Sequence, residues 1–247
     1  MLRVHVLGSG DAFNGGGALH SCYLVEHDTG TILLECGPSV LAAMKREHVP
    51  TDVPDAVLIS HLHGDHFGGI PFLFLEYAYM NPRSRPLVIA GPPTTASRVK
   101  ALTEALYADV RGCRHIEFPL EYLEVRPGQR FELAGMNVEA FQVPHSAEPF
   151  CLGYRIVGGG GTLLFSGDSA WTDAFAERSR DTDVFLCECC SVDPVSHLHT
   201  CYRDIVAHRG ELACKRLVLT HLGADVRTSD AIDAELAVDG MVLHVAD

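Results

Sequence analysis

The chain has 247 residues, of which 47% are hydrophobic and 21% are charged. This balance is typical of a folded globular protein and argues against a disordered chain. The formal net charge is −13, with only three lysines among nineteen cationic residues, so the sequence disfavours extended RNA or DNA as a partner. A small anionic substrate remains compatible, because a bound metal ion can supply positive charge locally.

The start of the chain, MLRVHVLGSG, lacks the charged start and apolar core of a secretion signal. No apolar run approaches the length needed to cross a bilayer. The nine cysteines are an odd number, and the cluster of Cys187, Cys189 and Cys190 has no second Cys-x-x-Cys pair beside it, which disfavours a separate cysteine-zinc site. We therefore expect reduced thiols, a cytoplasmic location and no membrane partner.

Short apolar runs, many of them β-branched, recur along the whole chain and predict strands. The predicted strands cover residues 2–7, 22–26, 31–35, 56–60, 87–90, 137–143, 151–157, 162–166, 184–188, 216–220 and 241–245. Helix-forming segments lie between them, several after Pro, Ser, Thr or Asp as start signals. The predicted helices cover residues 39–48, 69–80, 94–109, 172–180, 201–209 and 229–236. This mixture predicts an α/β protein with two sheets covered by helices.

Two glycine-rich pieces, residues 14–18 and 158–161, are short and flanked by strand-like sequence. We interpret them as turns and expect the second to close a hairpin. The glycines of LGSGDAFNGGG are not spaced G-x-G-x-x-G ahead of a helix, so a dinucleotide-binding loop is not supported. No repeat or linker divides the chain, and we expect one domain over residues 1–247.

The stretch VLISHLHGDHFGG at residues 57–69 contains four side chains that can bind a metal: His61, His63, Asp65 and His66. His61 and His63 are two apart in extended chain and therefore point to the same side, and Gly64 permits a turn before the other two. Imidazole together with carboxylate suits zinc, with manganese or iron as alternatives.

Three further apolar runs end abruptly in a potential ligand: FQVP leads to His145, LLFSG to Asp168 and LVLT to His221. Ligands that follow strands at one edge of a sheet converge on one site. Seven potential ligands then divide naturally between two metals. Most histidines in proteins are ordinary core or surface residues. We therefore assign no function to seven of the others, namely His5, His20, His27, His48, His115, His208 and His244.

With these motifs in place, the chain resembles the metallo-β-lactamase fold hydrolases, whose His-x-His-x-Asp-His loop HLHGDH matches in full. The resemblance runs from LGSGDAF through LLECG, HLHGDHFGG, VPHS and SGDS to LVLTH, nearly the whole chain. It implies a four-layer αβ/βα sandwich of two mixed sheets flanked by helices. It also implies one metal on His61, His63 and His145, a second on Asp65, His66 and His221, and Asp168 as the bridge between them.

Two metals about 3.5–4 Å apart can hold a bridging water, lower its pKa and clamp the attacked group. The implied chemistry is hydrolysis by a metal-bridging hydroxide, with Asp65 among the catalytic residues. His63 argues against the redox branch of the fold, which usually has Glu at that position for di-iron, so zinc is our first expectation. One position departs from the family: Glu35 of ECG stands where an Asp usually supports the ligand loop from outside the metal sphere.

Within the family, LGSGDAF, SGDS and the C-terminal TH are most similar to the ribonuclease Z and cyclic-phosphodiesterase branch. There a further histidine, oriented by a glutamate, protonates the departing oxygen. Glu188 and His199 fit these roles, since HTCYRDI resembles the family's His-x-x-Tyr pattern, with His197 as the alternative. All three could instead be ordinary surface residues.

The tRNA-gripping Gly- and Pro-rich arm of ribonuclease Z has no counterpart between His145 and His221. With the acidic charge, this favours a small phosphodiester, such as a cyclic nucleotide, over tRNA. The alternatives are an acyl hydrolase acting on a thioester, lactone or β-lactam, and a non-catalytic metal-binding protein. The apolar PFLFLEYAYM segment at 71–80 could lie inside the protein or in a homodimer interface.

Three residues near these motifs have two interpretations. Trp171, just after SGDS, could form a wall of the pocket and stack a base, although a lone tryptophan is more often in the core. Tyr202 and Arg203 could meet phosphate oxygens or be ordinary surface residues of a helix.

Overall fold

Two seven-stranded mixed sheets form the centre of the computed structural model, which describes residues 1–107, 117–146 and 150–246. The first sheet has the order β14-β1-β2-β3-β4-β5-β6, and the second β13-β12-β11-β10-β9-β8-β7. The strands of the first sheet are β14 (Val242–His244), β1 (Arg3–Gly8), β2 (Cys22–His27), β3 (Gly30–Leu34), β4 (Ala56–Leu58), β5 (Leu87–Gly91) and β6 (Leu120–Glu124). Those of the second are β13 (Glu235–Leu236), β12 (Arg216–Thr220), β11 (Val184–Glu188), β10 (Gly161–Phe165), β9 (Cys151–Gly158), β8 (Met136–Val143) and β7 (Arg130–Leu133).

Each sheet changes from antiparallel to parallel pairing half way across. The first is antiparallel from β14 to β3 and parallel from β3 to β6. The second is antiparallel from β7 to β10 and parallel from β10 to β13. The parallel strands β4 and β11 are buried at every residue, which explains their unbroken apolar sequences, because parallel sheets are covered on both faces.

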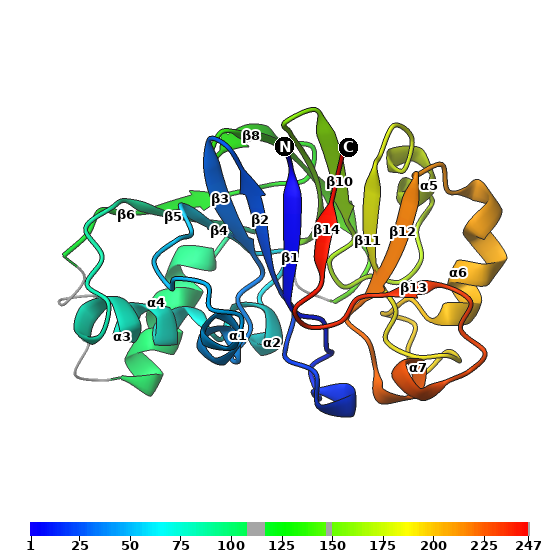
Figure 1. Ribbon diagram of the computed structural model, residues 1–247, viewed down its shortest axis with the longest axis horizontal. Coiled ribbons are helices and arrows are strands. Elements are labelled where there is room, and N and C mark those ends of the chain that lie inside the picture. Colours follow the sequence, from blue (N-terminus) through cyan, green and yellow to red (C-terminus); the bar gives the residue numbers. More distant parts are fainter. Residues whose placement is uncertain (108–116, 147–149, 247) are drawn as a thin grey trace.

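Three hydrophobic cores separate the four layers. The central core lies between the sheets, where Val4 and Tyr23 of one sheet belong to the same cluster as Tyr154 and Leu186 of the other. A second core lies under α1 (Val40–Arg46), α3 (Ile70–Tyr79) and α4 (Thr95–Leu106), and a third under α5 (Asp173–Arg178) and α6 (Tyr202–His208). Figure 1 shows the two helix groups on the outer faces of the sandwich. The expected four-layer αβ/βα fold is confirmed.

The two ends of the sandwich differ. In Figure 1 the start of β1 and the end of β14 lie at the top, whereas α2 (Gly64–Phe67), α7 (Ala224–Thr228) and the 3-10 turn η1 (Gly15–Gly17) lie at the lower end. The lower end carries the turns that follow β1, β4 and β12. The candidate site is built from these turns together with the segments that follow β8, β10 and β11.

The glycine-rich segment 158–161 closes the β9–β10 hairpin, as predicted. Gly158 pairs with Gly161, and the two glycines between them have φ values of 57° and 82°. Two successive residues with positive φ are what a tight hairpin turn requires, and glycine adopts them without steric cost.

The prediction of a helix over residues 229–236 is wrong. The local helix is α7, which ends at Thr228, and Glu235 and Leu236 instead form β13 beside β12. Arg216 of β12 pairs with Glu235 through both carboxylate oxygens, at 2.5 and 2.8 Å, so tertiary pairing overrides the local helical pattern. Strands β6, β7 and β13 were not predicted, and α4 ends at Leu106, with residues 108–109 of the predicted helix outside the described residues.

Within the described part of the chain, none of the helices combines the length and the apolar content that crossing a membrane would require.

Candidate metal centre

The turn after β4 presents four of the predicted ligands. His61 and His63 follow the strand in extended chain, and His63 precedes α2, whose first turn contains Asp65 and His66. His61 and His66 are almost fully buried, whereas His63 is exposed. One short strand-turn-helix unit therefore directs an apolar strand into the core and its polar end into the site.

The remaining three predicted ligands follow other strands at the same end of the sandwich. His145 follows β8, Asp168 follows β10 and His221 follows β12, and all three are buried. His221 has a φ of 53°, an unusual backbone conformation for a residue other than glycine, of a kind that clusters at functional sites.

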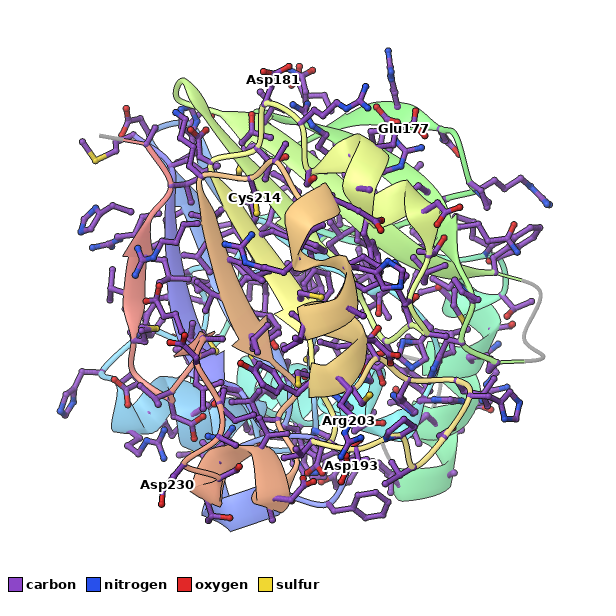
Figure 2. The ribbon with its side chains drawn as sticks, turned by 90° about the vertical axis from the view of Figure 1, so that its right-hand side faces the viewer. Glu177, Asp181, Asp193, Arg203, Cys214 and Asp230 are labelled. Atoms are coloured by element: carbon purple, nitrogen blue, oxygen red, sulfur yellow. The ribbon has the colours of Figure 1, made fainter. Side chains whose placement is uncertain are left out.

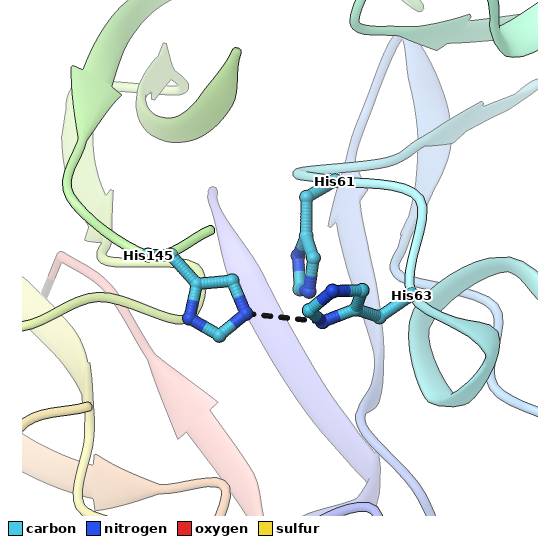
Figure 3. A group of neighbouring side chains, drawn as sticks. All are labelled: His61, His63 and His145. Atoms are coloured by element: carbon cyan, nitrogen blue, oxygen red, sulfur yellow. Dashed lines mark hydrogen bonds between the residues drawn. The ribbon is translucent and has the colours of Figure 1, made fainter. Parts of the chain in front are cut away.

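His61, His63 and His145 form the first group of potential ligands. Figure 3 shows the three rings converging from two separate segments of the chain. Nε2 of His145 lies 3.1 Å from Nδ1 of His63, and one ligand atom from each of the three lies within 4.8 Å of the others. Three imidazole nitrogens at this spacing suit zinc.

Asp65, His66, Asp168 and His221 form the second group, with the same spacing limit. Oδ2 of Asp65 lies 3.1 Å from Nε2 of His66 and 3.3 Å from Nε2 of His221. The rings of His66 and His221 are stacked, with centroids 5.3 Å apart. This group combines two imidazoles with two carboxylates.

The carboxylate of Asp168 lies between the two groups. Its Oδ2 is 3.2 Å from Nε2 of His66 and 3.3 Å from Nε2 of His221. The same oxygen is 3.9 Å from Nε2 of His61 and 3.9 Å from Nε2 of His145. One oxygen atom thus faces imidazoles of both groups.

The spacing and burial of these atoms fit bound metal ions. Ligands about 2.0–2.1 Å from a tetrahedral zinc stand about 3.3 Å from one another, close to the separations around Asp168. Nε2 of His61 and Nε2 of His66 are buried without a hydrogen-bond partner. Because an unpaired buried nitrogen is costly, a metal ion would satisfy both.

Neighbouring groups fix the rings through the nitrogens that face away from the site. Ser60 Oγ lies 2.9 Å from Nδ1 of His61, and the carbonyl of Leu198 lies 3.0 Å from Nδ1 of His145. Such partners select the tautomer and orient a metal-binding histidine.

Glu35 supports the loop from beneath. Its fully buried side chain accepts a hydrogen bond from the amide of Ser60 at 3.0 Å, and its other oxygen lies 3.3 Å from Nδ1 of His66. Burial raises the pKa of Glu35, and the neighbouring His66 opposes that rise. Its φ of 62° is a left-handed conformation. The glutamate side chain, which is longer than the usual aspartate, therefore reaches the ligand loop from this position.

Glu188 and His199 form a hydrogen-bonded pair beside the candidate ligands. Glu188 is fully buried at the end of β11, accepts from the amide of Ser169, and lies 3.0 Å from Nδ1 of His199. Burial lowers the pKa of His199, but the hydrogen bond to Glu188 and the negative charges of Glu188 and Asp168 together raise it by more, so the net shift is upward. His197 is exposed and does not line the cavity that contains His199.

A cavity of about 440 Å³ opens over the metal-binding groups. It is lined by Asp11, Ala12, Phe13, His63, Asp65, Cys190, Val195, Ser196, His199, His221, Gly223, Ala224 and Asp225. The segments at 11–13 and 195–196 were not predicted as part of the site, although Asp11 is a carboxylate within the LGSGDAF motif. The turn after β1 reaches the cavity because η1 packs against α7.

The cavity is not lined by the three residues for which the sequence allowed two interpretations, namely Trp171, Tyr202 and Arg203. Trp171 stacks on His208 at 4.6 Å between ring centroids and packs edge-on against Phe175. The hydroxyl of Tyr202 accepts a hydrogen bond from a backbone amide at 2.8 Å. Arg203 pairs with Asp193, both labelled in Figure 2. Among the described residues, the lining of the cavity thus has no arginine or lysine.

Solved structures with the same fold include the metallo-β-lactamase fold protein YhfI from Bacillus subtilis, with a TM-score of 0.77 and 23% identity over 99% of this chain and 100% of that one. The short form of human tRNase Z superposes with a TM-score of 0.80 at 21% identity, again covering 99% of this chain and 100% of that one. These likenesses show the metallo-β-lactamase fold.

Sequence relatives extend over nearly the whole chain. A protein of Mycobacterium tuberculosis described as uncharacterized is 30% identical over 248 residues, 98% of this chain and 88% of the relative. A ribonuclease Z of Methanosarcina acetivorans is 24% identical over 278 residues, 91% of this chain and 88% of the relative. The family model described as anti-Pycsar protein Apyc1 matches residues 2–238. The chain therefore belongs to the anti-Pycsar protein Apyc1 family, within the metallo-β-lactamase fold.

Proposed function

We propose that the protein is a binuclear metal-dependent hydrolase that cleaves a small phosphodiester. The observation that carries the proposal is the position of Asp168 Oδ2 between two groups of ligands, within 3.2–3.9 Å of four imidazole nitrogens. His61, His63 and His145 would hold one metal, Asp65, His66 and His221 the other, and Asp168 both. Two zinc ions fit this ligand set, and manganese or iron suits the same donors.

Bound metals would supply an activated water and neutralise charge on the attacked phosphate. The protein contributes the positions of the ligands and the side chain that donates a proton. His61 and His145 are fixed by Ser60 and by the carbonyl of Leu198, so their metal-facing nitrogens are set before binding. Such preorganisation lowers the cost of assembling the site.

His199 is suited to protonate the departing oxygen. Its Nδ1 is held by Glu188 at 3.0 Å, and the residue lines the cavity, which leaves Nε2 as the nitrogen available to a substrate. The upward shift in the pKa of His199 favours the protonated form that a general acid needs. Glu188 acts by orienting this ring and by stabilising its positive charge.

The cavity favours a compact substrate. Its volume of about 440 Å³ is in the range of small-ligand sites. The described lining residues include no arginine or lysine that could track a long phosphate backbone. The names of two similar proteins also support phosphate-ester chemistry: the ribonuclease Z of Methanosarcina acetivorans and a diphosphatase of the PhnP family.

The test combines metal analysis with a substrate panel. Purified protein should hold about two metal equivalents per chain, and the zinc-loaded protein should hydrolyse bis-aryl phosphate and a cyclic nucleotide. Thioester, lactone and nitrocefin are the competing substrates. Turnover of these acyl compounds without turnover of any phosphodiester would refute the proposal, and stable protein that binds no metal would indicate an interaction role instead. Cytoplasmic location and homodimer formation stay predictions, which cell fractionation and light scattering would test.

A further inference from the structure

The side chain of Phe13 lies in the lining of the cavity over the metal centre and is 89% exposed. Exposed hydrophobic residues scattered over a surface need no explanation. Phe13 differs, because the same cavity contains His63 and His199. Phe13 is therefore available to contact a ligand in this cavity.

The loop that carries Phe13 is fixed by its own hydrogen bonds. Oδ1 of Asp11 accepts from the amide of Phe13 at 3.1 Å and from the amide of Gly15 at 2.8 Å. Asn14, in a left-handed conformation with φ of 54°, donates from its side chain to the carbonyl of Ala18 at 2.8 Å. Phe13 is thus held outward by a defined turn.

The base of the loop is fastened to the C-terminal part of the chain. Oδ1 of Asp239 accepts from the amide and the hydroxyl of Ser9 at 3.0 and 2.8 Å, and Oδ2 accepts from the amide of Leu19 at 2.9 Å. Arg227 of α7 donates to the same Ser9 hydroxyl at 2.9 Å. The two ends of the loop, at Ser9 and Leu19, are thus held by the same carboxylate.

A second exposed apolar side chain, Val195, lines the same cavity and is 75% exposed. The cavity therefore has apolar surface at its rim and histidines near the metal groups. The lining also includes the exposed residue Asp225, whose carboxylate disfavours additional phosphates on a substrate. This arrangement suits a ligand with one charged phosphodiester and one flat apolar ring.

We propose that Phe13 is a specificity-determining residue that stacks on the aromatic base of a nucleotide phosphodiester, with Val195 as a further apolar contact. The inference rests on the proposed phosphodiesterase function. It concerns the base of the substrate, which the metal-binding groups would not contact. Stacking of a base on an aromatic side chain typically contributes enough affinity for about a tenfold effect.

The test compares two substrates that share one phosphodiester. Adenosine 3′,5′-cyclic monophosphate has a base, and methyl ribofuranoside 3,5-cyclic phosphate lacks it. Phe13→Ala should raise KM about tenfold for the nucleotide, with kcat nearly unchanged, and should leave both constants unchanged for the base-free ester. Phe13→Trp should retain the wild-type preference, because the larger ring still stacks. Met80→Ala removes another exposed apolar side chain, 75% exposed and outside the lining, and should change neither substrate.

Binding measured by calorimetry separates this inference from the proposed function. Adenosine 5′-monophosphate should bind zinc-loaded wild-type protein more tightly than ribose 5-phosphate. Phe13→Ala should lower the ratio of the two affinities about tenfold. If both cyclic esters are hydrolysed equally well by wild type and by Phe13→Ala, the stacking role is wrong while the phosphodiesterase function stands. If neither ester is hydrolysed, the proposed function fails, and equal binding of the two monophosphates to both proteins overturns the stacking role as well.

Discussion

Replacing Glu35 by glutamine tests whether the buried carboxylate beneath the ligand loop tunes the second metal group. Glu35 is fully buried, holds the amide of Ser60 at 3.0 Å, and places Oε2 3.3 Å from Nδ1 of His66. The amide of glutamine has nearly the same shape but no charge. We expect Glu35→Gln to fold and to bind metal more weakly at the group that contains His66.

The magnitude follows from the geometry. Two full charges 3.3 Å apart interact by about 5 kcal/mol at an effective dielectric constant of about 20. A metal-binding imidazole is neutral overall, so only part of this interaction is available. Loss of a carboxylate behind a metal-bound histidine typically weakens metal binding by about 10- to 100-fold, which is about 1.4–2.7 kcal/mol. We expect the loss of zinc affinity in Glu35→Gln to be about 1.4–2.7 kcal/mol, below the value for two full charges.

The assay is competition for zinc with a chelator of known affinity, followed until both sites are filled. In Glu35→Gln one site should weaken about 10- to 100-fold, and the other should change little. Glu76→Gln is the matched control, because Glu76 is also buried but pairs with Lys45 at 2.9 Å away from the site. Equal zinc affinities for wild type and Glu35→Gln would refute the reasoning, as would an equal loss in the control.

Three further outcomes are expected. Asp168→Asn should weaken metal binding by more than about 100-fold and abolish turnover, because one oxygen serves both groups; full metal content measured by elemental analysis would contradict the bridging role. His199→Ala should lower turnover of an alkyl phosphodiester by about 10²- to 10⁴-fold and that of a nitrophenyl ester much less, since the better leaving group needs no proton; equal turnover of both by variant and wild type would remove the general-acid role. Gly15→Ala should lower stability by about 1–3 kcal/mol in thermal unfolding, because a Cβ there would stand 2.6 Å from the amide nitrogen of Ala224. Gly210→Ala, with no atom within 4 Å of its Cβ position, is the control, and equal melting temperatures would disprove the clash.

The sequence already contained most of the fold and the candidate ligands. Buried parallel strands such as β11 appear as unbroken apolar runs, because both of their faces are covered. The ligands are recognisable because each follows such a run directly, as His221 follows β12. Both features are local, so a single pass along the chain finds them.

Other elements depended on contacts between distant segments. Residues 229–236 have a helical pattern, yet Glu235 pairs with Arg216 and joins a sheet. Strand β7 has only one buried residue among four, so its apolar signal is weak, and its partner β8 determines its conformation.

The surroundings of the candidate metal centre were decided by tertiary structure alone. The sequence offered His197 and His199 as alternatives, and only the chain path places His199 against Glu188. The position of Trp171 after SGDS made it the candidate for an aromatic wall of the pocket, but it packs against His208. Phe13 lines the cavity instead. The candidate ligands are metal-binding residue types that follow strands, so the sequence indicates them. The wall of a cavity is a property of which loops meet, and that is determined when the two sheets pack together.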